Sequence, residues 1–428
     1  MRLYPILVRL LRPLALAWMR SRRGVAEGWA ATVAERQGAL PARRDRPLWL
    51  HAASVGEVHA ALPLLRALHE RWPGLPVQLS AFTPTGLARW RALYPDSASA
   101  ALPLDHPDSV ARALDALRPR VLLIVETELW PNLLRAAHAR QIPVLFVSAR
   151  VRESSLRGWR RWVGPKLLAE ALAPVRWLGA QTAADAARFA RLGATRVAVA
   201  GNLKWDARPP VDAALQAEFA AALQARSAWL AASTHPGEDE ILLAAHAALL
   251  KQDPACLLLL APRHPRRAEE VAALCAQAGL RVARRSRGES PAAAQVWLID
   301  TLGELTALMA ACPRVFLGGS LVPVGGHNLL EPAALDCALA VGPHTDNAAE
   351  VAAALEQAGG LQRVADAAAL AALLQQWFSQ PAQAAASAAA ARACLEAGGG
   401  AVQAALAQLA PLLETPACLL YTSDAADE

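Results

Sequence analysis

The chain has 428 residues, more than one average domain, and 54% of them are hydrophobic, so we expect two domains with sizeable cores. A formal net charge of +6 and an isoelectric point near 9.3 favour anionic partners such as phosphates, acidic sugars or an anionic membrane surface. Nucleic acid is a disfavoured partner, because no basic stripe with interleaved aromatic residues occurs. The cysteines lack the spacing of a metal site or disulfide framework and are expected to be buried thiols of a reducing compartment: Cys256, Cys275, Cys312, Cys337, Cys394 and Cys418.

The first predicted element is a membrane-associated helix within residues 1–25. Residues 4–19 are apolar but are interrupted by Arg9, Arg12 and Pro13, and three more arginines follow by position 23. The segment is too short and too charged for a clean membrane span and lacks a convincing signal-peptide cleavage site. It fits a helix lying at the membrane interface with its arginines near lipid phosphates. The alternatives are a buried first helix and a signal-like or single-spanning anchor.

Short apolar runs alternate with helical patterns through the rest of the chain, in two series. Continuous apolar runs separated by helices indicate parallel sheets that are covered on both faces. The first series comprises the runs 48–52, 77–81, 121–125, 144–148, 177–180 and 197–200. The second series comprises the runs 229–232, 256–261, 281–283, 296–299, 315–317 and 339–341. We therefore predict an α/β protein with two Rossmann-like domains.

The two series also set the expected domain boundaries. The first domain is expected at 26–205, a linker at 206–226 and the second domain at 227–413, of which 347–413 are closing helices. The composition changes abruptly near the end of the chain. Residues 414–428 are therefore expected to be a tail, either disordered or an artefact.

Polar motifs follow nearly every predicted strand. Ligands of open parallel sheets bind at the carboxyl ends of the strands, so two such domains facing one another would enclose a central cleft. The first motif, His-Ala-Ala-Ser-Val-Gly-Glu at residues 51–57, places Glu57 at a helix start. Glu57 either closes a capping box with Ser54 or accepts a proton from an attacking hydroxyl, with the helix dipole helping to keep it ionised.

Residues 318–332 form a glycine-rich loop between a short apolar run and a helix start. Glycines let backbone N–H groups approach an anion closely, and the following helix end adds unpaired donors. Asn328 is expected to cap that helix, and Glu331 either completes a capping box or holds a ribose hydroxyl. The loop therefore predicts a nucleotide phosphate site that includes Gly318, Gly319, Ser320, Gly325 and Gly326.

Two more motifs end strands of the second series. Pro262 and a second proline bracket Arg263, which suits a guanidinium held against a phosphate or carboxylate; a solvated basic turn is the alternative. The motif Asp-Thr-Leu-Gly-Glu at 300–304 opens another helix, where Gly303 would let a ligand approach the backbone. Both motifs are expected at the same sheet edge as the glycine-rich loop.

Two carboxylates, Glu126 and Glu128, end a strand of the first series and precede Trp130. They either orient sugar hydroxyls, or Glu126 forms an internal ion pair with an arginine. The pattern Asp-x-Asp, which commonly holds a metal-bound diphosphate, does not occur in the chain. The missing pattern favours transfer without a metal, although Glu126 and Glu128 at this spacing could in principle bind a cation. No cofactor is expected.

Lysine and asparagine are rare in this arginine- and alanine-rich chain, with three and four residues respectively. Three of the four asparagines and one of the three lysines fall within motifs: Asn132 in Glu-Thr-Glu-Leu-Trp-Pro-Asn, Asn202 and Lys204 in Gly-Asn-Leu-Lys-Trp-Asp, and Asn328 in the glycine-rich loop. Residue types that are rare in the overall composition are more often retained for a structural or functional role at the positions where they occur.

Six motifs occur along the chain in this order: His-Ala-Ala-Ser-Val-Gly-Glu, Glu-Thr-Glu-Leu-Trp-Pro-Asn, Gly-Asn-Leu-Lys-Trp-Asp, Pro-Arg-His-Pro, Asp-Thr-x-Gly-Glu-Leu and the glycine-rich loop. The set closely resembles that of the 3-deoxy-D-manno-octulosonic acid (Kdo) transferases of lipopolysaccharide synthesis. The resemblance covers about residues 1–413. It implies an inverting, two-domain GT-B glycosyltransferase that moves Kdo from CMP-Kdo to lipid IVA, the lipid A precursor. It also implies a location at the cytoplasmic face of the inner membrane, with CMP-Kdo as donor substrate.

The resemblance also implies roles for individual residues. Glu57 would be the proton acceptor, and Lys204, or less strongly Arg150, would pair with the Kdo carboxylate or a lipid A phosphate. The residues that would contact CMP are Pro262, Arg263, Leu302, Gly303, Glu304, Asn328, Leu329, Leu330 and Glu331. The residues that would contact Kdo or the acceptor are Ser54, Thr83, Gly86, Glu126, Glu128 and Lys204.

Two rival functions are kept. One is another GT-B nucleotide-sugar transferase or an epimerase, and the other is a sugar-binding protein without catalysis. No residue pattern favours a particular oligomeric state or number of transferred Kdo units.

Overall fold

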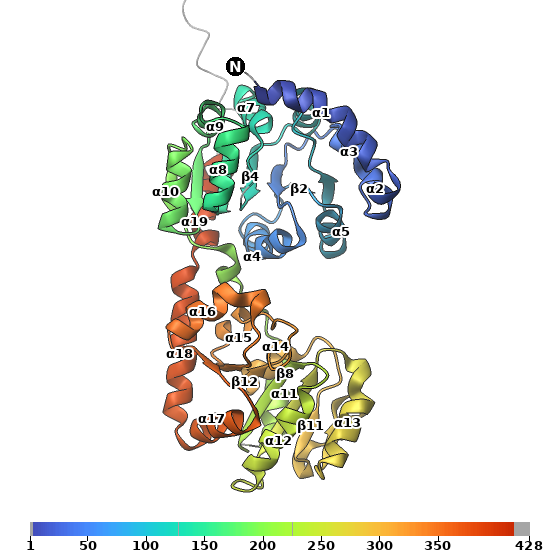
Figure 1. Ribbon diagram of the computed structural model, residues 1–428, viewed down its shortest axis with the longest axis vertical. Coiled ribbons are helices and arrows are strands. Elements are labelled where there is room, and N and C mark those ends of the chain that lie inside the picture. Colours follow the sequence, from blue (N-terminus) through green and yellow to red (C-terminus); the bar gives the residue numbers. More distant parts are fainter. Residues whose placement is uncertain (1–2, 127, 225, 415–428) are drawn as a thin grey trace, which may run out of the picture. The chain divides into compact units, whose positions relative to one another are not determined.

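The computed structural model describes residues 3–126, 128–224 and 226–414, which divide into two compact units (Figure 1). The first unit runs to Asp206 and resumes at Gly398, and the second comprises Ala207–Ala397. The expected tail beyond residue 414 lies outside the described residues, as do Cys418 and position 127 of the Glu-Thr-Glu motif.

In the described part of the first unit, seven parallel strands form one sheet in the order β3-β2-β1-β4-β5-β6-β7. The strand order reverses between β1 and β4, so the carboxyl ends of these two strands make the topological switch point, where ligands of such sheets bind. The strands are β1 (Leu48–His51), β2 (Val77–Ala81), β3 (Ala98–Ala101), β4 (Val121–Val125), β5 (Val144–Ala149), β6 (Trp177–Ala180) and β7 (Val197–Val199).

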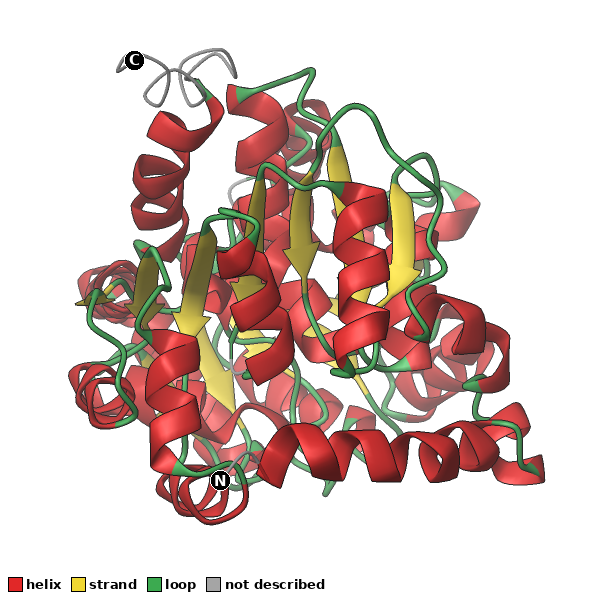
Figure 2. Ribbon diagram, turned by 90° about the horizontal axis from the view of Figure 1, so that it is seen from above, coloured by secondary structure: helices red, strands yellow, loops and turns green. Residues whose placement is uncertain are grey.

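Helices cover both faces of this sheet (Figure 2). Alternate residues of β1 enter different cores: Leu48 and Leu50 pack on one side and Trp49 on the other, which explains the continuous apolar run. The helices of the unit are α1 (Leu3–Met19), α2 (Arg22–Ala26), η1 (Ala30–Thr32), α3 (Val33–Arg36), α4 (Val55–Arg71), α5 (Pro84–Leu93), α6 (Pro107–Leu117), α7 (Pro131–Ala139), α8 (Glu153–Trp162), α9 (Pro165–Leu172), α10 (Ala183–Arg191), η2 (Leu203–Asp206) and α19 (Ala401–Leu413).

The described part of the second unit holds another sheet of seven parallel strands, in the order β10-β11-β9-β8-β12-β13-β14. Its switch point lies between β8 and β12. The strands are β8 (Ala228–Thr234), β9 (Leu257–Pro262), β10 (Val282–Arg284), β11 (Val296–Leu298), β12 (Arg314–Leu317), β13 (Ala338–Val341) and β14 (Leu361–Arg363). The helices are α11 (Ala213–Leu223), α12 (Asp239–Leu250), η3 (Pro265–Arg267), α13 (Ala268–Gln277), η4 (Arg285–Arg287), η5 (Pro291–Ala293), α14 (Leu305–Ala311), α15 (Leu330–Ala334), η6 (Asp346–Ala348), α16 (Ala349–Gln357), α17 (Ala367–Ser379) and α18 (Pro381–Gly398).

The two series of strands are confirmed, but the domain boundaries differ from those expected. Helix α19, expected in the second domain, buries Leu406 and Leu409 in a core of the first unit, where it lies among blue and green elements in Figure 1. The expected linker 206–226 is mostly helix α11 of the second unit, because Phe219 is fully buried and its ring lies 5.6 Å from that of Trp297.

Helix α1 has an exposed apolar stripe. Ile6, Leu10, Leu14 and Trp18, spaced four residues apart, are 55%, 68%, 66% and 43% exposed, so they share one face of the helix. The hydroxyl of Tyr4, on the same helix, donates to buried Asp105 at 2.8 Å. Among the described residues, no helix combines the length and apolar character needed to cross a membrane.

Candidate active site

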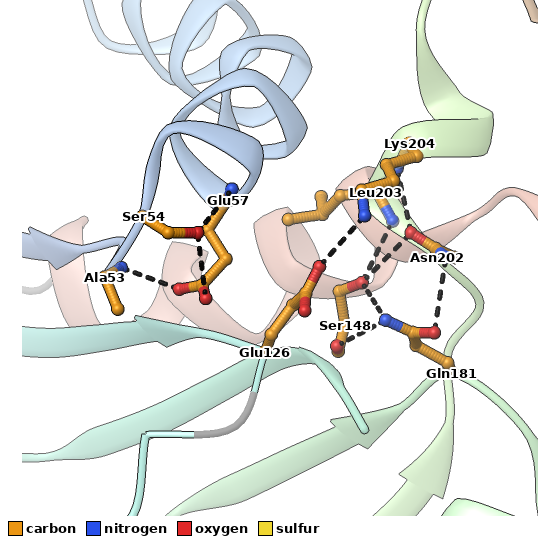
Figure 3. Close-up of polar contacts among 9 residues, drawn as sticks. All are labelled: Ala53, Ser54, Glu57, Glu126, Ser148, Gln181, Asn202, Leu203 and Lys204. Carbon is orange, nitrogen blue, oxygen red and sulfur yellow. Dashed lines mark hydrogen bonds and ion pairs between the residues drawn. The ribbon is translucent and has the colours of Figure 1, made fainter. Parts of the chain in front are cut away.

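The candidate base, Glu57, lies on the first turn of α4, three residues after the turn that follows β1. Ser54 is the N-cap, and its Oγ accepts the Glu57 N–H at 3.5 Å. The Glu57 Oε2 atom in turn accepts the N–H of Ala53 at 2.6 Å (Figure 3). The capping-box interpretation is therefore correct in outline, and it fixes where the carboxylate points.

The pKa of Glu57 is raised to about 7, mainly by burial and to a smaller extent by the nearby carboxylates of Glu128 and Glu126, while the hydrogen bonds from Ala53 and Ser54 oppose the rise. The helix dipole was expected to keep this group ionised, but desolvation is the larger effect. A carboxylate whose pKa lies near neutral pH is suited to accept a proton in a reaction. The two interpretations of Glu57 are thus compatible, because one carboxylate both caps the helix and has the properties of a base.

Glu126 follows β4 at the other side of the switch point and points into the same region as Glu57 (Figure 3). Its φ of 57° is unusual for a residue with a side chain and is a source of strain of the kind found at functional sites. Its Oε1 lies 3.3 Å from the Nζ of Lys204, in η2. The ion pair foreseen for Glu126 is formed, but with this lysine instead of an arginine.

A hydrogen-bonded network holds the backbone that carries Lys204 (Figure 3). The Ser148 Oγ accepts the Leu203 N–H at 3.2 Å, and the Asn202 Oδ1 accepts the Lys204 N–H at 3.0 Å. Gln181 bridges the two, because its amide donates to the Ser148 carbonyl at 3.0 Å and accepts from the Asn202 amide at 3.2 Å. The rare asparagine of this motif therefore positions the lysine.

Glu128 is held by a ring nitrogen and lies near a second one. The Trp130 Nε1–H donates to its Oε2 at 2.7 Å, and the His51 Nε2 lies 3.8 Å from the same oxygen. Ser80 Oγ lies 2.9 Å from the His51 Nδ1 and accepts the Trp49 indole N–H at 2.8 Å. Ser80 therefore links the Trp49 and His51 side chains.

His51 was not predicted as a site residue, although it heads the first motif. Its side chain is fully buried, and its Nε2 has no hydrogen-bond partner among the described residues. The signal that the sequence offered was a histidine within an otherwise apolar strand.

Two residues predicted to contact substrate, Thr83 and Gly86, have structural partners within the first unit. The Thr83 Oγ1 caps α5 by accepting the Gly86 N–H at 3.1 Å and donates to the Ala53 carbonyl at 3.1 Å. Gly86 is buried, and a Cβ there would lie 2.9 Å from the Thr83 Oγ1. Together they fasten the turn whose N–H holds the Glu57 carboxylate.

The glycine-rich loop of the second unit does not offer the phosphate cradle that the sequence predicted. Its N–H groups at Gly319, Ser320 and Leu321 donate to the fully buried carboxylate of Glu238 at 2.7–2.9 Å. The His235 N–H donates to the same carboxylate at 2.9 Å. An internal anion thus occupies the loop.

The other glycines of the loop serve its own conformation. The Gly318 N–H donates to the Ala232 carbonyl and the Gly326 N–H to the Gly319 carbonyl, at 2.8 and 2.7 Å. Gly325 has a φ of 103°, and a Cβ there would lie 2.7 Å from the Asn347 side chain.

The segments predicted to contact CMP lie after β9, β11 and β12. Pro262 ends β9, and the exposed Arg263 donates its N–H to the Thr234 carbonyl at 3.0 Å. The Glu304 carboxylate is bound by Arg285 at 3.0 Å and by the Thr301 hydroxyl. Leu302 is 78% exposed, and Gly303, with a φ of 85°, has open space where a Cβ would lie.

At the start of the five-residue helix α15, Asn328 Oδ1 accepts the Leu330 N–H at 3.1 Å. This cap was expected, although the N-cap position itself belongs to Leu329. Leu329 and Leu330 are buried. The Glu331 carboxylate, half-buried, has no hydrogen-bond or ionic partner among the described residues, so the alternative capping box is not formed.

Comparison with known proteins identifies the family. Residues 31–207 match the family described as 3-Deoxy-D-manno-octulosonic-acid transferase (kdotransferase). The 3-deoxy-D-manno-octulosonic acid transferase of Bordetella pertussis is 40% identical over 420 residues, which are 94% of this chain and 97% of the relative. This chain belongs to the Kdo transferase family. A second Kdo transferase, from Haemophilus influenzae, is 37% identical over 84% of this chain and 86% of its own.

Proteins outside the Kdo transferase family share the fold of this chain. The UDP-GlcNAc 2-epimerase of Neisseria meningitidis, solved with UDP-GlcNAc, matches 85% of this chain and 100% of its own with a TM-score of 0.52. At 15% identity this likeness shows the GT-B fold alone. The epimerase alternative is therefore not supported, and the chain is a glycosyltransferase.

Proposed function

We propose that this protein transfers Kdo from CMP-Kdo to a hydroxyl of lipid IVA with inversion of the anomeric centre, and that Glu57 is the general base. The observation that carries the proposal is the Glu57 carboxylate, held by the Ala53 N–H at the switch point of the first sheet with a pKa of about 7. Such a group is ionised in a large fraction of molecules near neutral pH and still has appreciable affinity for the proton it removes.

In the proposed mechanism, Glu57 removes the proton of the acceptor hydroxyl as the oxygen attacks the anomeric carbon of Kdo. One carboxylate suffices, because an inverting transfer is a single displacement. Lys204 would pair with the Kdo carboxylate or with a lipid A phosphate. Its ion pair with Glu126 supports this role, since it keeps the ammonium group in the region of the base until an anionic ligand competes for it.

The second unit would bind the nucleotide. Arg263 would bind the CMP phosphate and stabilise it as it leaves, because its guanidinium lies exposed at the carboxyl edge of the sheet. Glu331 would hold the ribose hydroxyls. Its carboxylate suits this role because it is not engaged by any described residue and lies beside the Asn328 cap.

The apolar stripe of α1 would attach the enzyme to the cytoplasmic face of the inner membrane, where its lipid acceptor lies. Exposed leucines and a tryptophan on one face, with Arg9 and Arg12 on the same helix, are typical of a helix that lies in the lipid interface. Flotation with anionic vesicles tests this role. Leu10→Glu with Leu14→Glu should abolish flotation, whereas Val199→Glu, at an exposed apolar residue outside α1, should not.

The central test is incubation with CMP-Kdo and lipid IVA, followed by mass spectrometry of the lipid. Glu57→Gln should lose at least a hundredfold in transfer and still be stabilised by CMP in a thermal-shift assay. The matched control is Glu70→Gln on the exposed side of the same helix, which should transfer normally. Near-normal turnover of Glu57→Gln would reject the base assignment.

Two further experiments test which nucleotide is bound and whether a metal ion is required. CMP should raise the melting temperature and UDP should not, if the donor is a CMP-sugar. We also propose that transfer needs no metal. The sequence supports this part of the proposal only through its lack of the Asp-x-Asp pattern that commonly holds a metal-bound diphosphate. Activity that is lost with EDTA and restored by Mg²⁺ would overturn this part of the proposal.

A further inference from the structure

Three histidines and an arginine gather at the carboxyl edge of the second sheet. His235 follows β8, Arg263 and His264 follow β9, and His327 lies in the glycine-rich loop after β12. These strands are neighbours, in the order β9-β8-β12, so the cluster lies at the switch point of this sheet. None of the three histidines belongs to the nucleotide contacts described above.

Two of the histidines form a hydrogen-bonded pair. The Nε2 atoms of His235 and His327 are 2.9 Å apart, and their rings stack with centroids separated by 5.1 Å and planes inclined by 20°. The edge of the His264 ring approaches His235, with centroids 6.3 Å apart. Both members of the pair are half-buried, so the pair is accessible to a ligand.

The glycine-rich loop is built around this pair. Glu238 receives the N–H groups of the loop and of His235, so the backbone that precedes both rings is tied to one buried carboxylate. A Cβ at Gly319 would lie 3.2 Å from the His327 Nε2 and 3.4 Å from the His235 Cδ2. The glycine therefore makes room for the two imidazoles, and three of the loop's N–H groups are already bound to Glu238.

The pair can change its charge by one proton. Two neutral imidazoles that share one Nε2–H···Nε2 bond present one Nδ1–H donor and one Nδ1 lone pair at their outer ends. A pair with one more proton is a cation with donors at both ends. Two cationic side chains, Arg263 and Arg267, lie near the pair and favour an anion there, although Arg267 is itself paired with Asp239 at 2.6 Å. The buried Glu238 is an opposing charge.

These surroundings keep the pair neutral in the absence of ligand. Burial is the main cause that lowers the pKa of His235, and His264, Arg267 and Arg263 lower it further, whereas Glu238 raises it. The pKa of His327 is also lowered, by burial first and then by His235, Arg263 and His264, with Glu238 again opposing. An anion bound among these groups would reverse the balance, because a nearby opposite charge favours the protonated imidazole.

We propose that His235 and His327, with Arg263 and His264, form the phosphate subsite of the second unit, and that the histidine pair takes up a proton when the phosphate binds. This inference rests on the proposed binding of a CMP-sugar by the second unit. The ligand class is the phosphate of a cytidine nucleotide, which is recognised by side-chain donors instead of by the loop backbone.

Isothermal titration calorimetry of CMP binding to the full chain tests the proposal. Titration at pH 8, in two buffers of different ionisation enthalpy, gives the number of protons taken up. We expect an uptake approaching one proton for each CMP bound, and none for cytidine, which lacks the phosphate. His327→Gln and His235→Gln should abolish the uptake and weaken CMP binding at least tenfold, whereas His138→Gln, at an exposed histidine of α7, should change neither.

The outcomes separate this inference from the proposed function. CMP binding without proton uptake overturns the role of the pair and leaves the nucleotide assignment intact. Uptake that persists in both glutamine variants also overturns it, because the proton then resides elsewhere, for example on the phosphate. If wild type binds neither CMP nor cytidine, the nucleotide assignment of the second unit fails and the inference fails with it. The comparison of CMP with cytidine uses only the wild-type chain, so it stands even if a histidine variant does not fold.

Discussion

Ionising the buried carboxyl of Glu57, the proposed base, should lower the stability of the folded protein, and Glu57→Gln should remove this cost. In the folded protein its pKa is about 7, because burial opposes ionisation, whereas an unfolded chain has the ordinary value of 4.5. Between these values the folded state binds a proton that the unfolded state does not. The stabilisation from the protonated carboxyl is therefore complete below pH 4.5 and is lost as the pH rises through 7.

The size of the effect follows from the same values. The rise of the pKa from 4.5 to about 7 corresponds to about 3 kcal/mol, at about 1.4 kcal/mol for each tenfold change in proton affinity. Residual contact of the half-buried carboxylate with solvent reduces this to about 2 kcal/mol. Glutamine is neutral at every pH, and its amide oxygen can still accept the Ala53 N–H. The variant should therefore unfold about 4–8 °C higher than wild type at pH 8.5 and at about the same temperature at pH 4.5.

Thermal unfolding at the two pH values is the assay, with the wild type and Glu70→Gln alongside. The control removes a carboxylate from the exposed side of α4 and should change stability by less than about 0.5 kcal/mol at either pH. An equal stabilisation of Glu57→Gln at both pH values, or none at pH 8.5, would refute the argument that burial sets the pKa of this group.

Three further predictions concern groups held in unusual surroundings. Asp105 is buried, which raises its pKa to about 7, and it accepts the Tyr4 hydroxyl and two backbone N–H groups. Asp105→Ala leaves these donors without a partner, so it should cost about 3 kcal/mol in chemical unfolding and expose α1 to proteolysis. Glu238→Ala leaves four backbone donors unsatisfied and should cost about 3–5 kcal/mol, against little for the exposed Glu240→Ala in the same urea titration. Because Glu126 has a φ of 57°, Glu126→Gly should be about 1 kcal/mol more stable than Glu126→Ala by thermal unfolding, with both reduced in transfer.

The sequence predicted the central strands well, because a strand buried on both faces must be apolar throughout. Runs such as Val121–Val125 therefore coincide with the strands of the structure. It failed where that signal is absent. Strand β3 is Ala-Ser-Ala-Ala, which resembles the surrounding helical composition, and β14 ends in the exposed Arg363 at an edge of its sheet.

The boundary error at the C-terminus has a related cause. Helices α18 and α19 are both rich in alanine, and nothing in their patterns tells which sheet each one covers. That choice depends on partners far away in the sequence. The backbone N–H groups of Gly400 and Val402 donate to Asp206, at 2.6 and 2.7 Å, and Leu409 joins the core formed by α4.

The site residues divide in the same way. The position and the cap of Glu57 could be predicted because its cap, its helix and its strand are contiguous in the sequence. The contacts of His51 could not be predicted, because Ser80 and Glu128 belong to another strand and to a loop. A motif therefore predicts where a side chain lies along an element, whereas its hydrogen-bond partners come from elsewhere in the fold.

The glycine-rich loop is another case in which a distant residue decides what a motif can bind. Its backbone has the donors of an anion site, and a contiguous segment of sequence gives no reason to doubt that a phosphate fills it. Glu238, about 80 residues earlier in the chain, supplies the anion instead. A phosphate bound by such a loop would meet a fixed set of backbone dipoles, whose strength does not depend on pH. Because Glu238 already neutralises those dipoles, the proposed phosphate subsite would depend on Arg263 and on histidines that can gain a proton. Such a subsite would be titratable, so under this proposal phosphate binding should weaken as the pH rises.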